Sequence, residues 1–115
     1  MPRLMSVSLT EPQVRARTKT VTRRMGWLKP PLKPGQRLTL CRKVMGRRKD
    51  EPLVRIVDVE VISVRRERLD AITPQDVAAE GFALTPAEFI VFFCGSHKDC
   101  QPDTIVTRIE WRYLA

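Results

Sequence analysis

An alternating segment from Leu53 to Val64 constrains the fold of this chain more than any other feature. Successive side chains of a β-strand point to opposite sides of the sheet, so a strand here has two different faces. One face carries Val54, Ile56, Asp58, Glu60 and Ile62, and the other carries Leu53, Arg55, Val57, Val59, Val61 and Ser63. The second face is nearly all aliphatic, which predicts a sheet with that face against a core.

The remaining segments predict further strands and short helices. Strands are expected from Leu4 to Leu9, from Arg37 to Val44 and from Thr104 to Tyr113. Helices are expected after three Thr-x-Pro or Thr-Pro starts, at Thr10, Thr73 and Thr85, with Gly81 ending the second. The segments 25–35 and 45–52 are expected to be loops. This order predicts an α+β domain over residues 1–115 with a small, strongly curved or closed sheet.

Length and composition predict a single cytoplasmic domain. A chain of 115 residues has room for one modest core. Its longest apolar run has six residues, Phe89 to Cys94, far below the roughly 18 that a membrane helix needs. The N-terminal residues lack the pattern of a signal peptide. Three cysteines, an odd number, are typical of a reducing compartment rather than of a disulfide framework.

The positive charge of the chain is concentrated in its first part. Residues 1–68 contain 18 Lys and Arg and 6 Asp and Glu, whereas residues 69–115 contain 3 and 7. Such an asymmetry predicts a face that binds a polyanion such as a nucleic acid. The alternative is that the charge serves only solubility. The aromatic residues do not alternate with the basic runs, which disfavours a long stacking platform for single strands.

The segment from Arg15 to Arg24 is the strongest candidate for a binding site. It contains five cations and three threonines but no acidic residue. Arginine forks and a lysine point charge suit phosphate or carboxylate groups, and crowding by arginines disfavours the charged form of Lys19. The segment therefore predicts an anion site that includes Lys19, Thr20, Thr22, Arg23 and Arg24. The alternative is a solvated basic loop.

Two further groups of residues could carry chemistry. Glu80 lies at the end of an expected helix, where the helix dipole disfavours an anion unless a cation or a donor meets it. The alternative is an ordinary exposed acid. Cys94, His97 and Cys100 lie within seven residues, and with Cys41 they would complete a structural zinc shell. The alternatives are buried thiols with a polar loop, or a nucleophilic cysteine beside His97.

The order of these motifs resembles an ASCH domain of the PUA-like superfamily. A short strand and helix precede Lys19-Thr-Val-Thr-Arg23, and a Pro-Gly turn at Pro34 precedes a strand. An Ala-Glu-Gly-Phe corner at Glu80 follows the long strand, and a Val-Thr-Arg-Ile-Glu-Trp strand closes the chain at Trp111. The resemblance extends from Leu4 to Tyr113 and is strongest to small ASCH proteins of bacteria and phages.

This resemblance implies a small β-barrel of about five to six strands with two or three flanking short helices, and a cleft that binds RNA, a nucleoside or a nucleotide. The ASCH amidohydrolases that deacetylate N4-acetylcytidine use a Lys, a Thr and a Glu, which map onto Lys19, Thr22 and Glu80. That reaction requires no cofactor. The expected contacts to phosphate or nucleic acid come from Arg15, Arg17, Thr20, Arg23, Arg24, Arg47 and Arg48.

The chain departs from the small amidohydrolases in three segments. These are the loop 25–33, the basic connection 46–49 and the cysteine segment near the C-terminus. These segments could change which substrate the site accepts. Two alternatives to an amidohydrolase therefore stay open. One is a binding module without catalysis, which would grip RNA or DNA through its basic face. The other is a ribonuclease.

Overall fold

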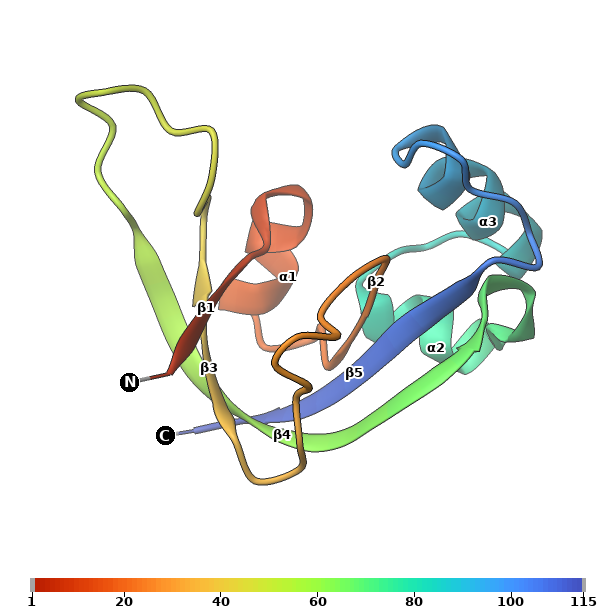
Figure 1. Ribbon diagram of the computed structural model, residues 1–115, viewed down its shortest axis with the longest axis horizontal. Coiled ribbons are helices and arrows are strands. Elements are labelled where there is room, and N and C mark those ends of the chain that lie inside the picture. Colours follow the sequence, from red (N-terminus) through yellow and green to blue (C-terminus); the bar gives the residue numbers. More distant parts are fainter. Residues whose placement is uncertain (1, 115) are drawn as a thin grey trace.

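The computed structural model describes residues 2–114 and has an α+β fold built on one curled sheet (Figure 1). In the described part of the chain the sheet has five strands: β1 (Arg3–Ser6), β2 (Val21–Arg24), β3 (Arg37–Cys41), β4 (Arg55–Arg68) and β5 (Ile105–Tyr113). The strand order is β1-β3-β4-β5-β2. Only the β1–β3 pair is parallel. The sheet is a half-barrel whose edge strands are β1 and β2. The expected strongly curved sheet is therefore confirmed, and the sheet is not closed.

The long strand β4 organises the sheet, as its sequence pattern predicts. It pairs with β3 through its first half and with β5 along most of its length. A shift in register between Val61 and Ser63 marks a bulge, which increases the local bend of a strand. Val59 and Val61 of the aliphatic face are buried with Leu38, Leu40 and Trp111 in the main core.

Three short helices complete the fold: α1 (Glu11–Arg15), α2 (Pro74–Glu80) and α3 (Pro86–Gly95). Figure 1 shows α1 within the curl of the sheet and α2 and α3 beside the start of β5. The Thr73 hydroxyl accepts a bond from the Asp76 amide, and Thr85 and Glu88 form a reciprocal capping box. The expected caps of α2 and α3 are therefore confirmed. A second core lies here, formed by Leu69, Ile72, Val77, Phe89, Phe93 and Val106.

The sequence-based element bounds need four corrections. The first strand ends at Ser6, and a 3-10 turn, η1 (Ser8–Thr10), replaces its second half. The strand expected from Arg37 ends at Cys41, whereas β4 continues to Arg68 because its charged end pairs with β5. Separately from these bounds, the cap expected at Thr10 is wrong, because the Thr10 side chain makes no bond to α1.

The fourth correction concerns the second half of the basic segment. Residues Val21–Arg24, which the sequence pattern does not predict as a strand, form β2, which pairs antiparallel with β5. Val21, Thr22 and Arg23 are all buried there. The distant carboxylates that neutralise this run, described below, cannot be identified from the local sequence.

Residues 2–114 contain no helix with both the length and the apolar character that crossing a bilayer requires. This agrees with the short apolar runs of the sequence.

Candidate functional site

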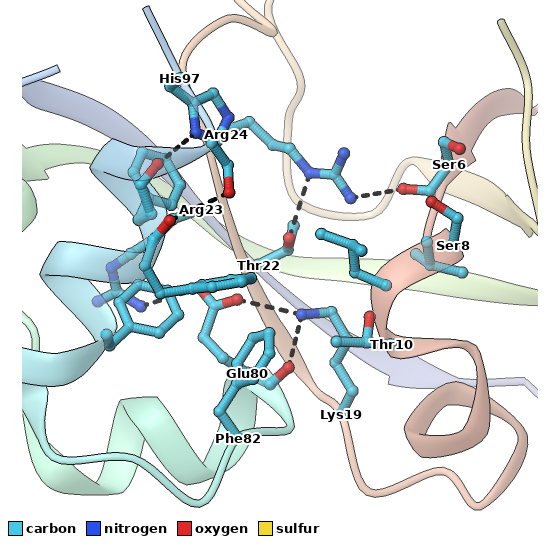
Figure 2. Close-up of a pocket in the computed structure, with 16 residues that line it drawn as sticks. Ser6, Ser8, Thr10, Lys19, Thr22, Arg23, Arg24, Glu80, Phe82 and His97 are labelled. Atoms are coloured by element: carbon cyan, nitrogen blue, oxygen red, sulfur yellow. Dashed lines mark hydrogen bonds and ion pairs between the residues drawn. The ribbon is translucent and has the colours of Figure 1, made fainter. Parts of the chain in front are cut away.

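A cavity of about 180 Å³ lies between the β1–α1 connection, the strand β2 and helix α3 (Figure 2). Its floor is polar and consists of Lys19, Thr22, Arg23, Arg24 and Glu80. One side, here called the hydroxyl wall, consists of Ser6, Ser8 and Thr10. The other side, the aromatic wall, consists of Phe82, Phe89, Phe92, Phe93 and His97. Val7, Leu9 and Ser96 complete the lining.

Lys19 and Glu80 form a buried ion pair at the floor of this cavity. The Lys19 Nζ donates to Glu80 Oε1 at 3.1 Å and to the main-chain oxygen of Glu80 at 2.7 Å. The two side chains are only 3% and 4% exposed. Burial lowers the pKa of Lys19 below its ordinary value, although the Glu80 carboxylate opposes that change. Lys19 is therefore a cation that can lose its proton more readily than a lysine in water.

The backbone around Glu80 is held by neighbours from α1 and from the start of β2. The Thr20 amide donates to the Ala79 oxygen at 2.8 Å, and Gln13 Nε2 donates to the Gly81 oxygen at 2.8 Å. Gly81 ends α2 with a φ of 102°, in the left-handed region that favours glycine. A Cβ at this position would lie 3.0 Å from Gln13 Cγ. The Ala-Glu-Gly-Phe corner thus needs its glycine for both conformation and space.

Arg23 connects Glu80 to a second layer of carboxylates. Its side chain is fully buried, and its Nη1 lies 3.4 Å from Glu80 Oε2. Its Nη2 lies 2.6 Å from Asp76 Oδ2 and 2.9 Å from Glu67 Oε2. Arg108 also contacts Asp76, at 2.7 Å and 3.1 Å, and the bonds from Arg108 and then from Arg23 lower the pKa of Asp76 to about 2. This network fixes one oxygen of Glu80 while the other faces Lys19.

Thr22 and Arg24 lie next to the ion pair on β2. The Thr22 hydroxyl accepts a bond from Arg24 Nε at 3.2 Å. Arg24 Nη2 also donates to the Ser6 oxygen at 2.7 Å, which bridges the two edge strands of the half-barrel. Because the Thr22 oxygen acts as an acceptor in this contact, its own proton remains free to be donated into the cavity.

The aromatic wall is a packed group of rings. The Phe82 ring centroid lies 5.2 Å from that of Phe92 and 5.6 Å from that of Phe89. His97 stacks on Phe93 at 4.1 Å, and its Nδ1 lies 2.8 Å from the Phe93 oxygen. A carbonyl oxygen only accepts, so Nδ1 is the protonated nitrogen and Nε2 can accept a bond in the neutral ring. The wall offers apolar faces to a flat ligand.

The structure brings the three predicted catalytic positions, Lys19, Thr22 and Glu80, into one cavity. Arg24 lines the same cavity, as does Arg23. However, the predicted phosphate contact of Arg23 does not fit its geometry, because its side chain is buried among three carboxylates.

The other predicted anion-binding residues lie outside this cavity. Arg15 pairs with Glu11 at 2.9 Å, and Arg17 lies over the Tyr113 ring at 5.7 Å. Thr20 holds its neighbours through its main chain. Arg47 and Arg48 belong to the exposed connection between β3 and β4. Any ligand of these residues would contact a different part of the surface.

The predicted zinc site of Cys41, Cys94, His97 and Cys100 is not assembled. Between residues 2 and 114, no three Cys, His, Asp or Glu side chains are grouped so that they could hold a metal ion. Cys41 is buried on β3, where its Sγ contacts the Thr39 oxygen, whereas Cys94 and Cys100 pack on the second core. Burial and then the Cys94 thiol raise the pKa of Cys100 to about 11, which favours the thiol form. Cys94, His97 and Cys100 are close in sequence, but this spacing does not place Cys41 beside them.

The sequence-based prediction missed most of the two walls. Phe89, Phe93 and His97 recur at intervals of four residues, the spacing of one helix face, but this pattern does not show that the face lines a cavity, and only His97 was predicted as a site residue, a zinc ligand. Asp76 and Glu67, the partners of Arg23, carry no local signal, since they are 53 and 44 residues away in sequence.

Comparison of whole structures identifies the fold. No protein-family model matches the sequence, and no curated protein matches it. The structure is similar to an ASCH domain from Lactobacillus crispatus JV V101, with a TM-score of 0.63 and 14% identity over 91% of this chain and 70% of that one. It is also similar to protein EF3133 from Enterococcus faecalis V583, described as DUF984, with a TM-score of 0.67 and 15% identity over 99% and 77% of the two chains.

A third similar structure is the hypothetical protein PH0355, with a TM-score of 0.67 and 14% identity over 99% of this chain and 100% of that one. At these identities the likeness concerns the fold. The chain therefore has the fold of an ASCH domain over nearly its whole length, as the order of its motifs predicts.

Proposed function

We propose that this ASCH-fold protein binds a nucleoside in its cavity and hydrolyses the amide of an N4-acylated cytidine. The observation that supports this most is the buried Lys19–Glu80 pair, which lies beside the free proton of Thr22. Buried ionisable groups that converge in a cavity are typical of sites where protons are transferred.

The dimensions and the lining of the cavity suit a flat heterocycle. A cavity of about 150 Å³ accommodates a benzene ring. The cavity here, at about 180 Å³, has room for a pyrimidine with a small exocyclic group, and the exposed Ser8 marks the side on which the rest of a nucleoside can extend toward solvent. Phe82 and Phe92 line the cavity and offer apolar surface to the base. Lys19, Thr22 and Glu80 lie where an exocyclic amide can meet donors and an acceptor.

The proposed reaction adds water to the acyl carbon. The Glu80 carboxylate takes a proton from the attacking water as the new C–O bond forms, and the acyl oxygen becomes an oxyanion. The Lys19 ammonium and the Thr22 hydroxyl donate to that oxygen. The C–N bond then breaks, and the proton held by Glu80 passes to N4. The products are cytidine and the carboxylic acid, and no other reactant is consumed.

This scheme assigns Thr22 as a donor rather than as the nucleophile. A nucleophilic threonine needs a base within hydrogen-bond reach of its hydroxyl. In the described residues the only side-chain contact of the Thr22 hydroxyl is Arg24 Nε, which is itself a donor. A donor to the developing oxyanion needs no such base.

The test is turnover of a panel of N4-acylated cytidines, followed by the release of cytidine. Wild-type protein is expected to hydrolyse the member whose acyl group fits the cavity, with acetyl as the first candidate. Lys19→Ala and Glu80→Ala are expected to lose this activity. Thr22→Val, which keeps the shape of the side chain, is expected to lower kcat by about 100-fold, since the loss of one oxyanion donor has that effect.

The outcome that contradicts the proposal is equally definite. Absence of turnover by wild-type protein across the panel would refute it. Equal turnover by wild type, Lys19→Ala and Glu80→Ala would assign the activity to another site. Circular dichroism of each variant verifies that the protein is folded.

A further inference from the structure

We propose that the hydroxyl wall of Ser6, Ser8 and Thr10 binds the ribose of the nucleoside, while the aromatic wall holds its base. This inference rests on the proposed function, and it names the residues that would distinguish a nucleoside from a free base. The two walls face each other across the cavity, with the Lys19 ammonium between them (Figure 2).

Thr10 supplies the strongest observation. Its residue is only 4% exposed, and it lines the cavity. It occupies the position before α1, yet its side chain makes no capping bond. Its hydroxyl has no hydrogen-bond partner in residues 2–114. Because no described side chain or main-chain group bonds to it, both the proton and the lone pairs of the Thr10 hydroxyl are available to a ligand in the cavity.

Ser6 and Ser8 extend the wall from Thr10 toward the mouth. Neither serine hydroxyl has a partner in the part of the chain that the structure describes, although both residues line the cavity. The main-chain oxygen of Ser6 is held by Arg24 Nη2, which fixes the strand end that carries these side chains. Ser8 is exposed, so the row of hydroxyls runs from a buried position to the surface.

The chemistry of this wall fits sugar hydroxyls better than it fits phosphate. A hydroxyl both donates and accepts, which matches the groups of a ribose. A phosphate favours charge-assisted bonds from free cations. Here Lys19 is paired with Glu80, and Arg24 already uses Nε and Nη2 in contacts within the protein. A nucleoside, which joins a flat base to a polyol, presents the two surfaces that the cavity offers.

The experiment compares the binding of cytidine with that of 1-methylcytosine, which has a methyl group in place of the ribose. Titration calorimetry on the full chain is expected to give cytidine at least about tenfold tighter binding, the effect of one or two hydrogen bonds. Thr10→Val and Ser8→Ala are each expected to reduce this preference while leaving the affinity for 1-methylcytosine unchanged. The control is Ser96→Ala, whose hydroxyl lines the same cavity but already bonds to the Phe92 oxygen.

Equal affinity of wild type for the two compounds, or no binding of cytidine, would overturn the inference. So would an equal loss for both compounds in Thr10→Val. Neither compound carries an acyl group, so the result does not depend on hydrolysis. Ribose preference without turnover of acylated cytidine would refute only the proposed reaction, and turnover without ribose preference would refute only this inference.

Discussion

The Lys19–Glu80 pair makes a quantitative prediction about stability. Substitution of Glu80 by Gln keeps the size of the side chain and one acceptor oxygen but removes the negative charge. The Lys19 ammonium, 3.1 Å from Oε1, and the Arg23 guanidinium, 3.4 Å from Oε2, then lose a charged partner in a site that is almost inaccessible to water. We expect Glu80→Gln to be strongly destabilised at neutral pH.

The burial of both side chains determines the size of the effect. Breaking a buried ion pair by removal of one partner costs about 3–5 kcal/mol, and the remaining Gln oxygen favours the lower end, about 3 kcal/mol. Arg23 retains Asp76 and Glu67, which limits its share of the loss. In a domain of this size about 3 kcal/mol corresponds to a fall in Tm of roughly 12 °C.

The pH dependence of this loss has a definite sign. The folded-state pKa of Lys19 is lowered from its ordinary value of 10.5, chiefly by burial, and Glu80 opposes the change. Between the lowered folded value and 10.5 the unfolded chain binds more protons, so stability rises with pH in this window. Removal of the Glu80 charge lowers the folded-state pKa of Lys19 further. The difference between wild type and Glu80→Gln is therefore largest at neutral pH and narrows toward alkaline pH.

Urea denaturation of both proteins at a series of pH values measures this difference. Asp70→Asn is the matched control, because it removes a carboxylate from the exposed Arg68–Asp70 pair, and we expect a much smaller change. Lys19→Met combined with Glu80→Gln should be less destabilised than the sum of the single variants. A free energy of unfolding for Glu80→Gln within about 1 kcal/mol of wild type at neutral pH would refute the reasoning, since it falls below the range for buried pairs.

Three further predictions follow from the same geometry. Gly81→Ala should lower the free energy of unfolding by about 1–2 kcal/mol because of its positive φ, and more if Gln13 cannot move, whereas Gly26→Ala, with open space around it, should not. Asp76→Asn should lose less stability than wild type as the pH falls from about 3.8 to about 2. The lowered pKa of Asp76 contributes its full stability above about 3.8, and this contribution is lost by about 2. Denaturation of both proteins over this pH range measures the difference. Replacement of Arg47 and Arg48 by Gln should leave turnover of N4-acylated cytidine unchanged, because both residues lie outside the cavity, and a fall in turnover would contradict that separation.

The features of the fold that depend on local sequence could be predicted. The alternation in β4 identifies the face that Val59 and Val61 bury, and the Thr-Pro starts identify α2 and α3. Gly81 marks the end of α2 because only a left-handed residue fits there. Each of these signals acts over a few residues, and each is confirmed.

The features that depend on distant partners could not be predicted. Arg23 was expected to meet solvent or a phosphate, because its neighbours in sequence are cations. The structure buries it because Asp76, Glu67 and Glu80 come from the second half of the chain. Strand β2 was missed for the same reason. The four predicted zinc ligands are not grouped in residues 2–114, and the spacing of Cys94 and Cys100 carries no information on where Cys41 lies.

The convergence of Lys19, Thr22 and Glu80 could be predicted, but not from local sequence. No local pattern relates Lys19 to a glutamate 61 residues away. The order of motifs along the chain, through its resemblance to ASCH domains, predicted that these residues would meet. The hydroxyl wall and the aromatic wall around them depend on tertiary packing and are seen only in the structure.

The most direct measurement for the central claim is the rate of acetate release from N4-acetylcytidine by purified wild-type protein and by Lys19→Met. Met keeps an unbranched apolar stem like that of Lys19 and lacks the ammonium group. Parallel purification of the two proteins exposes any contaminating hydrolase. The account predicts multiple turnovers by wild type and at least about a 100-fold lower kcat for the variant, the loss expected for one oxyanion donor. Equal rates for the two proteins, or no release by wild type, would contradict it.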